Sequence, residues 1–208
     1  MKAQKVTVTI PQSTVRTPIP VIYIAIPPLV CNGAYILCNQ TKHCVLQCSR
    51  DGCYKELTLF CGEECTIDAT HPYGNAFYLT AHLPNTSNSS LLCNGASSCY
   101  GAHVKVGNNS IVNAQCNGFH ACEEVTMDVS SSSSVDLHCE GSQACFRTTL
   151  NASLSHNTSL NITCYGDNTA PVCWGTSING GVNSSVEQSC YGQKDCSDIN
   201  VQCDVFRH

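Results

Sequence analysis

One stretch decides the fold: residues 116–145 read CNGFHACEEVTMDVSSSSSVDLHCEGSQAC. It begins and ends with the same phrase, which is a cysteine, any residue, a glycine and, a few positions later, a second cysteine. Five copies of this phrase occur between residues 91 and 203, and their first cysteines are 23, 23, 25 and 26 residues apart. A nearly fixed period of this size is typical of solenoids, in which each unit stacks on the next. The sequence therefore predicts about five coils of 23–26 residues.

The residues before each phrase alternate between apolar and polar. In VDLHC, residues 135–139, the apolar Val135 and Leu137 alternate with polar residues. A period of two indicates a half-buried strand, whose cysteine faces inward with the aliphatic residues. A second apolar pattern follows each second cysteine, as in VTMDV at residues 125–129. Each coil is thus expected to carry two short strands around a Cys-x-Gly corner, where glycine permits a positive φ or a close backbone approach.

Cysteine supplies 18 of the 208 residues, while aromatic residues make up 7% and charged residues 12%. This composition approaches that of a disulfide scaffold, so we expect a secreted or cell-surface protein. Zinc is the competing interpretation, but only Cys44/Cys48 and Cys61/Cys65 approach the spacing of zinc ligands. We therefore predict no metal site. The disulfides expected to close each corner, or alternatively to join adjacent coils, involve Cys93, Cys99, Cys116, Cys122, Cys139, Cys145, Cys164, Cys173, Cys190 and Cys196.

Asn-x-Ser/Thr triplets, the acceptor sites of N-linked glycans, are dense in this chain. They begin at Asn39, Asn85, Asn88, Asn108, Asn151, Asn157, Asn161 and Asn183. Turn formation alone would explain any one of them, but eight in one small chain predict a glycan coat. Four of the sites, Asn108, Asn151, Asn157 and Asn183, lie in the polar segments after the second strand of a coil. Stacking is expected to bring these four to one edge of the column.

Three segments differ in composition. Residues 1–30 contain no cysteine and are expected to form an extended N-terminal arm. Residues 31–90 are expected to form a cysteine-rich cap or degenerate coils, since terminal solenoid units are commonly atypical. Within them CNGAYILC, residues 31–38, resembles the phrase with one extra residue, which predicts that the repeat begins there in degraded form. Residues 91–208 contain the solenoid repeats.

The arm contains two apolar runs. Residues 6–10 alternate between aliphatic residues and threonine, and residues 19–26 lie between prolines that keep the backbone extended. Neither run has a hairpin partner nearby, so it either caps its own column or adds a strand to the edge of a neighbouring molecule. The residues expected to form such an assembly strand are Val6, Val8, Ile10, Val21, Tyr23, Ile24 and Ile26.

Several function classes are disfavoured by the composition. A net charge of −5 with 10 Lys and Arg leaves no basic stripe for nucleic acid, and no run of about 18 apolar residues could span a membrane. We expect no enzymatic activity and no cofactor apart from N-linked glycans, because no catalytic motif occurs. Aromatic residues near the corners would offer sugars a stacking row, or would pack against the disulfides: Tyr100, Phe119, Phe146, Tyr165, Trp174 and Tyr191.

The Cys-x-Gly-x₃-Cys phrase over residues 91–203 resembles the cysteine-rich β-solenoid repeats of secreted and surface proteins of microbial eukaryotes, including glycoprotein fibril subunits. This resemblance implies an all-β, disulfide-rich, β-helix-like solenoid with a non-catalytic structural role in an extracellular filament or coat. With the arm as connector, we expect a head-to-tail homopolymer built by N-terminal strand addition, because a heterologous contact that does not close propagates. The alternative is a monomeric secreted adhesin or carbohydrate-binding module with a polysaccharide or other glycan as partner.

Overall fold

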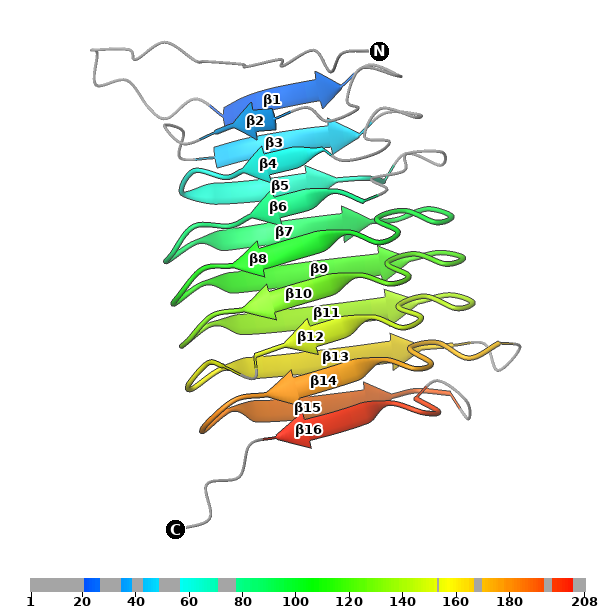
Figure 1. Cartoon of the computed structure of the whole chain (residues 1–208). Coiled ribbons are helices and arrows are strands. Elements are labelled where there is room, and N and C mark those ends of the chain that lie inside the picture. The colour runs from blue at the N-terminus through cyan, green and yellow to red at the C-terminus, as the bar shows by residue number, and fades with distance from the viewer. Residues whose placement is uncertain are drawn as a thin grey trace, which may run out of the picture.

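The computed structural model shows two parallel β-sheets wound together into one column (Figure 1). It describes residues 21–26, 35–38, 43–48, 57–70, 78–152, 154–166, 170–192 and 196–203. The regular elements of these residues are strands, which confirms the predicted all-β, disulfide-rich β-solenoid. No helix in this part of the chain is long and apolar enough to cross a membrane.

The odd-numbered strands form sheet A and the even-numbered strands form sheet B, each eight strands long. Sheet A contains β1 (Val21–Ile26), β3 (His43–Cys48), β5 (Glu64–Asp68), β7 (Asn88–Cys93), β9 (Ile111–Asn117), β11 (Ser134–Glu140), β13 (Ser159–Tyr165) and β15 (Ser185–Cys190). Sheet B contains β2 (Tyr35–Leu37), β4 (Thr58–Phe60), β6 (Thr80–His82), β8 (His103–Val106), β10 (Thr126–Val129), β12 (Thr149–Asn151), β14 (Ser177–Gly180) and β16 (Asn200–Cys203). The five coils predicted from the phrase are present, and three further strand pairs precede them.

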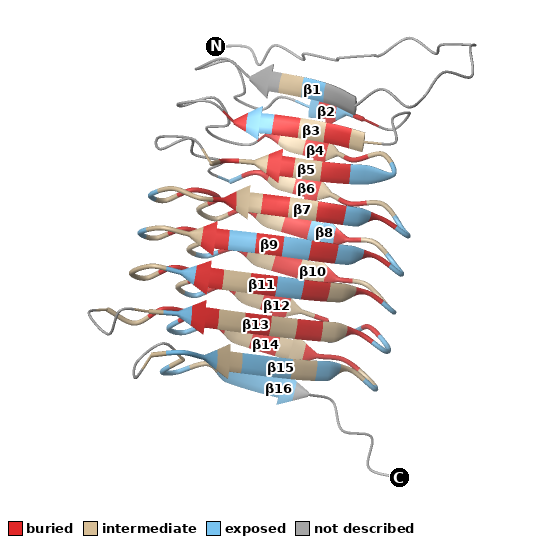
Figure 2. Cartoon of the chain, turned by 180° about the vertical axis from the view of Figure 1, so that it is seen from behind, coloured by how far each residue is buried: buried red, intermediate tan, exposed pale blue. Residues whose placement is uncertain are grey.

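Parallel pairing aligns equivalent residues of successive coils in rows along the column. Val135, for example, pairs with Val112 of the preceding coil and with Leu160 of the following one. Burial alternates along the strands from β2 to β14 (Figure 2), so every second row faces the core. One such inward row consists of Leu46, Ile67, Leu91, Ala114, Leu137 and Ile162, all buried. The core is therefore a narrow stack of aliphatic side chains, and it continues into stacked disulfides at one corner.

The first coils differ from the expected form of the degraded phrase. Cys38, at the end of β2, pairs with Cys44 of β3, so residues 31–38 do not close their own corner as the phrase does. The register explains the difference, because Ile26 of β1 occupies the position that Cys48 holds in β3. A cysteine is thus absent from the place where the first cysteine of a phrase would lie. The first cysteine of residues 31–38 lies outside the described residues.

The second apolar run of the expected arm forms a rung of its own column. β1 pairs in parallel with β3 along its whole length. The second run of the expected assembly strand therefore bonds within the chain: Val21, Tyr23, Ile24 and Ile26. The β3 edge is a short distance away along the chain, so closing this contact restricts little chain entropy. The first run, Val6, Val8 and Ile10, lies outside the described residues.

Candidate functional site

Each coil has two corners that could carry function. We call the turn from a sheet A strand to the next sheet B strand the disulfide corner, and the turn back to sheet A the return corner. Every phrase closes its own disulfide corner, which decides against bridges between adjacent coils for these pairs: Cys93–Cys99, Cys116–Cys122, Cys139–Cys145, Cys164–Cys173 and Cys190–Cys196.

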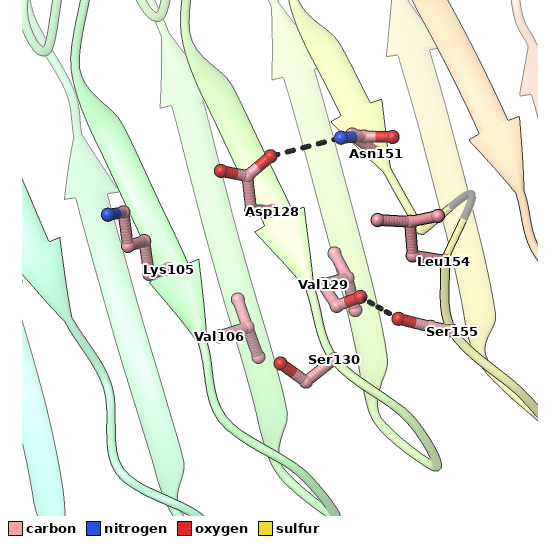
Figure 3. A pocket seen from close by; sticks show the side chains of 8 residues that line it. All are labelled: Lys105, Val106, Asp128, Val129, Ser130, Asn151, Leu154 and Ser155. Atoms are coloured by element: carbon pink, nitrogen blue, oxygen red, sulfur yellow. Dashed lines mark hydrogen bonds between the residues drawn. The ribbon is translucent and has the colours of Figure 1, made fainter.

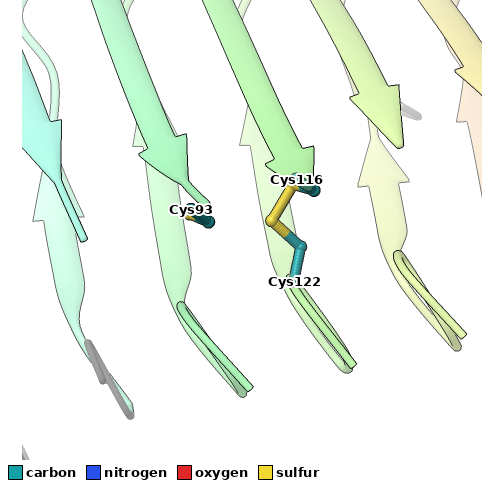
Figure 4. A group of neighbouring side chains, drawn as sticks. All are labelled: Cys93, Cys116 and Cys122. Carbon is teal, nitrogen blue, oxygen red and sulfur yellow. A yellow bond between two sulfur atoms is a disulfide. The ribbon is translucent and has the colours of Figure 1, made fainter. Parts of the chain in front are cut away.

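The disulfides stack on one another along the column. The sulfur atoms of Cys93, Cys116 and Cys122 all lie within 4.8 Å of one another (Figure 4). Cys116 and Cys122 are bonded to each other, and Cys93 is bonded within its own coil. A metal-binding thiolate needs a free sulfur, and these sulfurs are all in disulfide bonds.

The glycine of the phrase is required for both reasons that the sequence suggested. Gly118 has φ +140° and Gly141 has φ +106°, and residues with a side chain rarely adopt these backbone conformations. A Cβ added to Gly118 would also lie 3.0 Å from the carbonyl of Gly95, one coil earlier. A Cβ added to Gly141 would lie 3.1 Å from the Gly118 oxygen. The corners of successive coils therefore pack with their backbones almost touching.

In the first coils the described disulfides lie at the return corner instead. They join Cys38 to Cys44 and Cys61 to Cys65. Cys48 is also disulfide-bonded. Both cysteine pairs that approached zinc-ligand spacing are therefore made of oxidised cysteines.

The return corner contains a row of residues in the left-handed region. The row consists of residues with φ values between 55° and 59°: Thr86, Asn109, Ser132, Asn157 and Asn183. In the first four of these residues the backbone N–H donates to a carbonyl of the following coil. Asparagine adopts this conformation more readily than most residues. Turn geometry is therefore sufficient to explain the asparagines at 157 and 183, although both are also acceptor sites.

A ladder of buried hydroxyl groups follows this row, and the sequence reasoning missed it. The Ser110 Oγ donates to the Pro84 carbonyl (2.8 Å) and accepts from the Ser87 N–H (3.2 Å). The Ser133 Oγ repeats the pattern with the Gly107 carbonyl (2.7 Å) and the Ser110 N–H (3.1 Å). The signal was present as a serine or threonine at the same place in each coil, but it is hidden inside acceptor triplets and a run of serines.

Of the four acceptor asparagines expected at one edge, Asn108, Asn157 and Asn183 lie at the return corner and Asn151 does not. The return corner holds four exposed ones: Asn85, Asn108, Asn157 and Asn183. Asn151 lies instead on the outer face of sheet B, just before that corner, and Asn161 lies on the outer face of sheet A. Asn88 begins β7 and is exposed, while Asn39 lies outside the described residues. A glycosylated chain would therefore carry sugars at the return corner and on both faces.

A hollow of about 400 Å³ lies on sheet B beside the return corner (Figure 3). Within it the Asn151 Nδ2 donates to Asp128 Oδ1 (3.1 Å), and Asp128 Oδ2 lies 2.7 Å from His103 Nε2. Partial burial raises the pKa of Asp128, but the hydrogen bonds from His103 and Asn151 outweigh it and hold the pKa below its ordinary value. The carboxylate and amide of this hollow are thus already paired within the protein.

The corner aromatic residues form separate contacts rather than a single row. Tyr165 and Tyr191 stack with their ring centroids 4.4 Å apart and their planes 3° apart. The His138 ring lies beside Tyr165, and the other corner aromatic residues form the contacts Tyr78–Tyr100, Phe119–His120 and Phe146–Trp174. The Tyr165–Tyr191 pair alone among these extends the outer face of sheet A, where a ligand could reach it.

The chain is a cysteine-rich β-solenoid with disulfides at its corners and polar outer faces. No protein-family model matches it, and no curated protein or solved structure matches it either.

Proposed function

We propose that this chain is a non-catalytic structural subunit of an extracellular, glycosylated fibril or surface coat, in which the N-terminal segment of one subunit adds a strand to the column end of the next. The extracellular location is supported by the seven described disulfides, since such bonds persist in oxidising compartments. Eight acceptor triplets support the glycan coat.

The observation that carries the proposal is the open end formed by β15 and β16. In the described part of the chain, no strand pairs with the outer edge of either. The inward positions that are buried in β13 are half-buried or exposed in β15, and Gln188 replaces the aliphatic residue of its row. An unpaired parallel edge above an exposed core is a template for another strand.

The segment at residues 6–10 fits this template. It reads VTVTI, and β15 presents VEQSC at residues 186–190. Paired in parallel, the three aliphatic residues of the donor would extend the inward rows, and its threonines would face outward. In this register Lys5, directly before the segment, opposes Ser185 and has Glu187 as its diagonal neighbour, so the charges are complementary as well.

Residues 11–20 make the connection long enough to reach a neighbour. This segment contains three prolines, at 11, 18 and 20, which favour an extended backbone. Ten extended residues span up to about 33 Å. Because β1 is anchored in its own column, the donor is limited to the residues before this connection.

The decisive experiment compares particles of the wild type with those of two matched variants by negative-stain electron microscopy. Val8→Asp places a charge in the inward row and is expected to leave single particles, since a buried unpaired charge opposes strand addition. Thr9→Asp places the same charge outside and is expected to leave long fibres. A chain lacking residues 1–10 should remain folded and monomeric.

Other outcomes would reject the proposal. Fibres that persist in Val8→Asp, or without residues 1–10, would show that the N-terminal segment is not the connector. Single particles of the wild type would favour the alternative, a monomeric secreted adhesin or carbohydrate-binding module.

A further inference from the structure

A polar groove of about 440 Å³ crosses the outer face of sheet A. It runs over β9, β11 and β13 and ends beside Tyr191, which directly follows β15. At about 4.8 Å per rung this covers about 14 Å along the column, and its volume is within the range of about 300–1,000 Å³ common for ligand sites. The groove is thus long enough for a chain-like ligand.

The groove is lined mainly by side chains that both donate and accept hydrogen bonds. Asn113 pairs with Asp136 in the sheet register, and Gln115 pairs with His138, so two polar rows run side by side. Asn113, Gln115 and Asp136 are exposed, because the buried residues alternate with them along each strand. Amide, carboxylate and imidazole groups in rows suit a ligand that presents many hydroxyl groups.

One end of the groove adds an aromatic surface. Tyr165 and Tyr191 are 37% and 63% exposed, and the His138 ring lies 4.9 Å from that of Tyr165. An aromatic ring with a polar tip can contact the apolar face of a sugar while its hydroxyl group forms a hydrogen bond. The aromatic residues that matter for sugars are therefore this pair, not all six from the corners.

The charge on the outer face of sheet A indicates which kinds of polymer can bind there. The outward residues of the described sheet A strands include no lysine or arginine, and they include the carboxylates Asp136, Glu140 and Glu187. An anionic polysaccharide would be repelled from this surface. A peptide is a poor fit too, since the groove lacks the apolar anchor pocket or free strand edge that peptides use.

We propose that this groove binds a neutral, hydroxyl-rich glycan strand lying across successive rungs. The proposal goes beyond the filament and does not depend on it. Asn161, an acceptor site on the same face, would place its own glycan beside the groove if modified. The binding test therefore uses the full chain with Asn161→Gln, which removes that occupant.

The test measures binding by isothermal titration calorimetry with neutral hexasaccharides of glucose, mannose and N-acetylglucosamine, and with a uronic acid hexasaccharide. At least one neutral hexasaccharide is expected to bind, and the uronic acid hexasaccharide is expected to bind more weakly. Asp136→Ala and Tyr191→Ala should each weaken binding about tenfold, because each removes a direct contact from an exposed position. Asn179→Ala, on the outer face of sheet B, is the matched control and should leave affinity unchanged.

Three results would overturn the proposal. They are saturation by none of the neutral hexasaccharides, equal or tighter binding of the uronic acid hexasaccharide, and equal effects of Asp136→Ala, Tyr191→Ala and Asn179→Ala. Because binding is counted per chain, its failure can be told apart from a failure to form fibres.

Discussion

Ser110 belongs to two patterns at once. It ends the acceptor triplet that begins at Asn108, and it is a member of the buried hydroxyl ladder, with 1% of its surface exposed. Ser87 ends the triplet of Asn85 in the same way and is 2% exposed. An enzyme that recognises the triplet has to reach its hydroxyl residue as well as its asparagine. In the folded column that residue is inaccessible.

We therefore predict that Asn85 and Asn108 accept glycans only before their coils fold. Asn183 is the internal control, because the hydroxyl residue of its triplet, Ser185, is exposed. Unglycosylated folded protein, treated with an oligosaccharyltransferase and analysed by mass spectrometry, should be modified at Asn183 but not at Asn108. Reduced, unfolded protein should be modified at both. Modification of Asn108 in the folded protein would contradict the prediction.

The corner glycines allow a sharp comparison at the same scale. Gly118→Ala is expected to lower the free energy of unfolding by more than about 1 kcal/mol, because φ is +140° and the new Cβ would meet the Gly95 backbone. Gly175→Ala should lower it less, since φ is +67° and its Cβ would meet only the Arg147 side chain, at 3.5 Å. Urea unfolding of both variants measures the difference. Equal losses would show that close backbone approach is unimportant.

Among the elements, the disulfide corners are expected to stabilise the strands that they join. Replacing Cys139 and Cys145 together with alanine should lower the free energy of unfolding by about 2 kcal/mol, the value for closing a loop this short. The Cys38–Cys44 bridge has the same sequence separation of 6, so its removal is the matched comparison. Removal of the Cys139–Cys145 bridge should lower the free energy of unfolding more than removal of the Cys38–Cys44 bridge. The reason is that the sulfurs of Cys139 and Cys145 pack against the next coil. Thermal unfolding measures both losses. Unchanged stability in both double-cysteine variants would contradict the stabilising role of these disulfides.

The strands that could be predicted are those with visible alternation beside a repeated phrase. β9 and β11 are such strands, and the corner that closes β11 follows from the same phrase. β4 and β6 could not be found this way, because each has three residues and only one faces inward. A three-residue strand is stable only when a neighbouring coil pairs with it, and that pairing is not local in sequence.

The candidate sites show the same distinction between patterns that are local in sequence and contacts that form only when the coils stack. The acceptor triplets and the phrase cysteines are short local patterns, so the sequence contained them in full. The sheet A groove joins residues 23–26 positions apart, and Asp136 or Tyr191 looks like ordinary surface until the coils are stacked. The pairing of β1 within its own chain could not be predicted either, because it depends on a partner strand, β3, elsewhere in the sequence.

At the scale of the whole molecule, each rung pairs only with the rungs before and after it. The described disulfides join cysteines four to nine residues apart, so none links positions a full coil apart. Successive rungs are therefore held together by backbone hydrogen bonds and by the stacked core. β1 and β16 lie at opposite ends of the column (Figure 1).

A thread made of such columns would stretch in steps. Tension applied from the two ends acts along the inter-strand bonds, so the column should peel open one turn at a time. Each turn that opens should release about 17 residues, or about 60 Å of contour length, because the residues between the two bonded cysteines of the coil stay closed in a loop. Single-molecule force spectroscopy should show this sawtooth, with steps lengthening to about 80 Å under reductant. The material would yield gradually and absorb shock, with its extensibility set by the redox state of its surroundings.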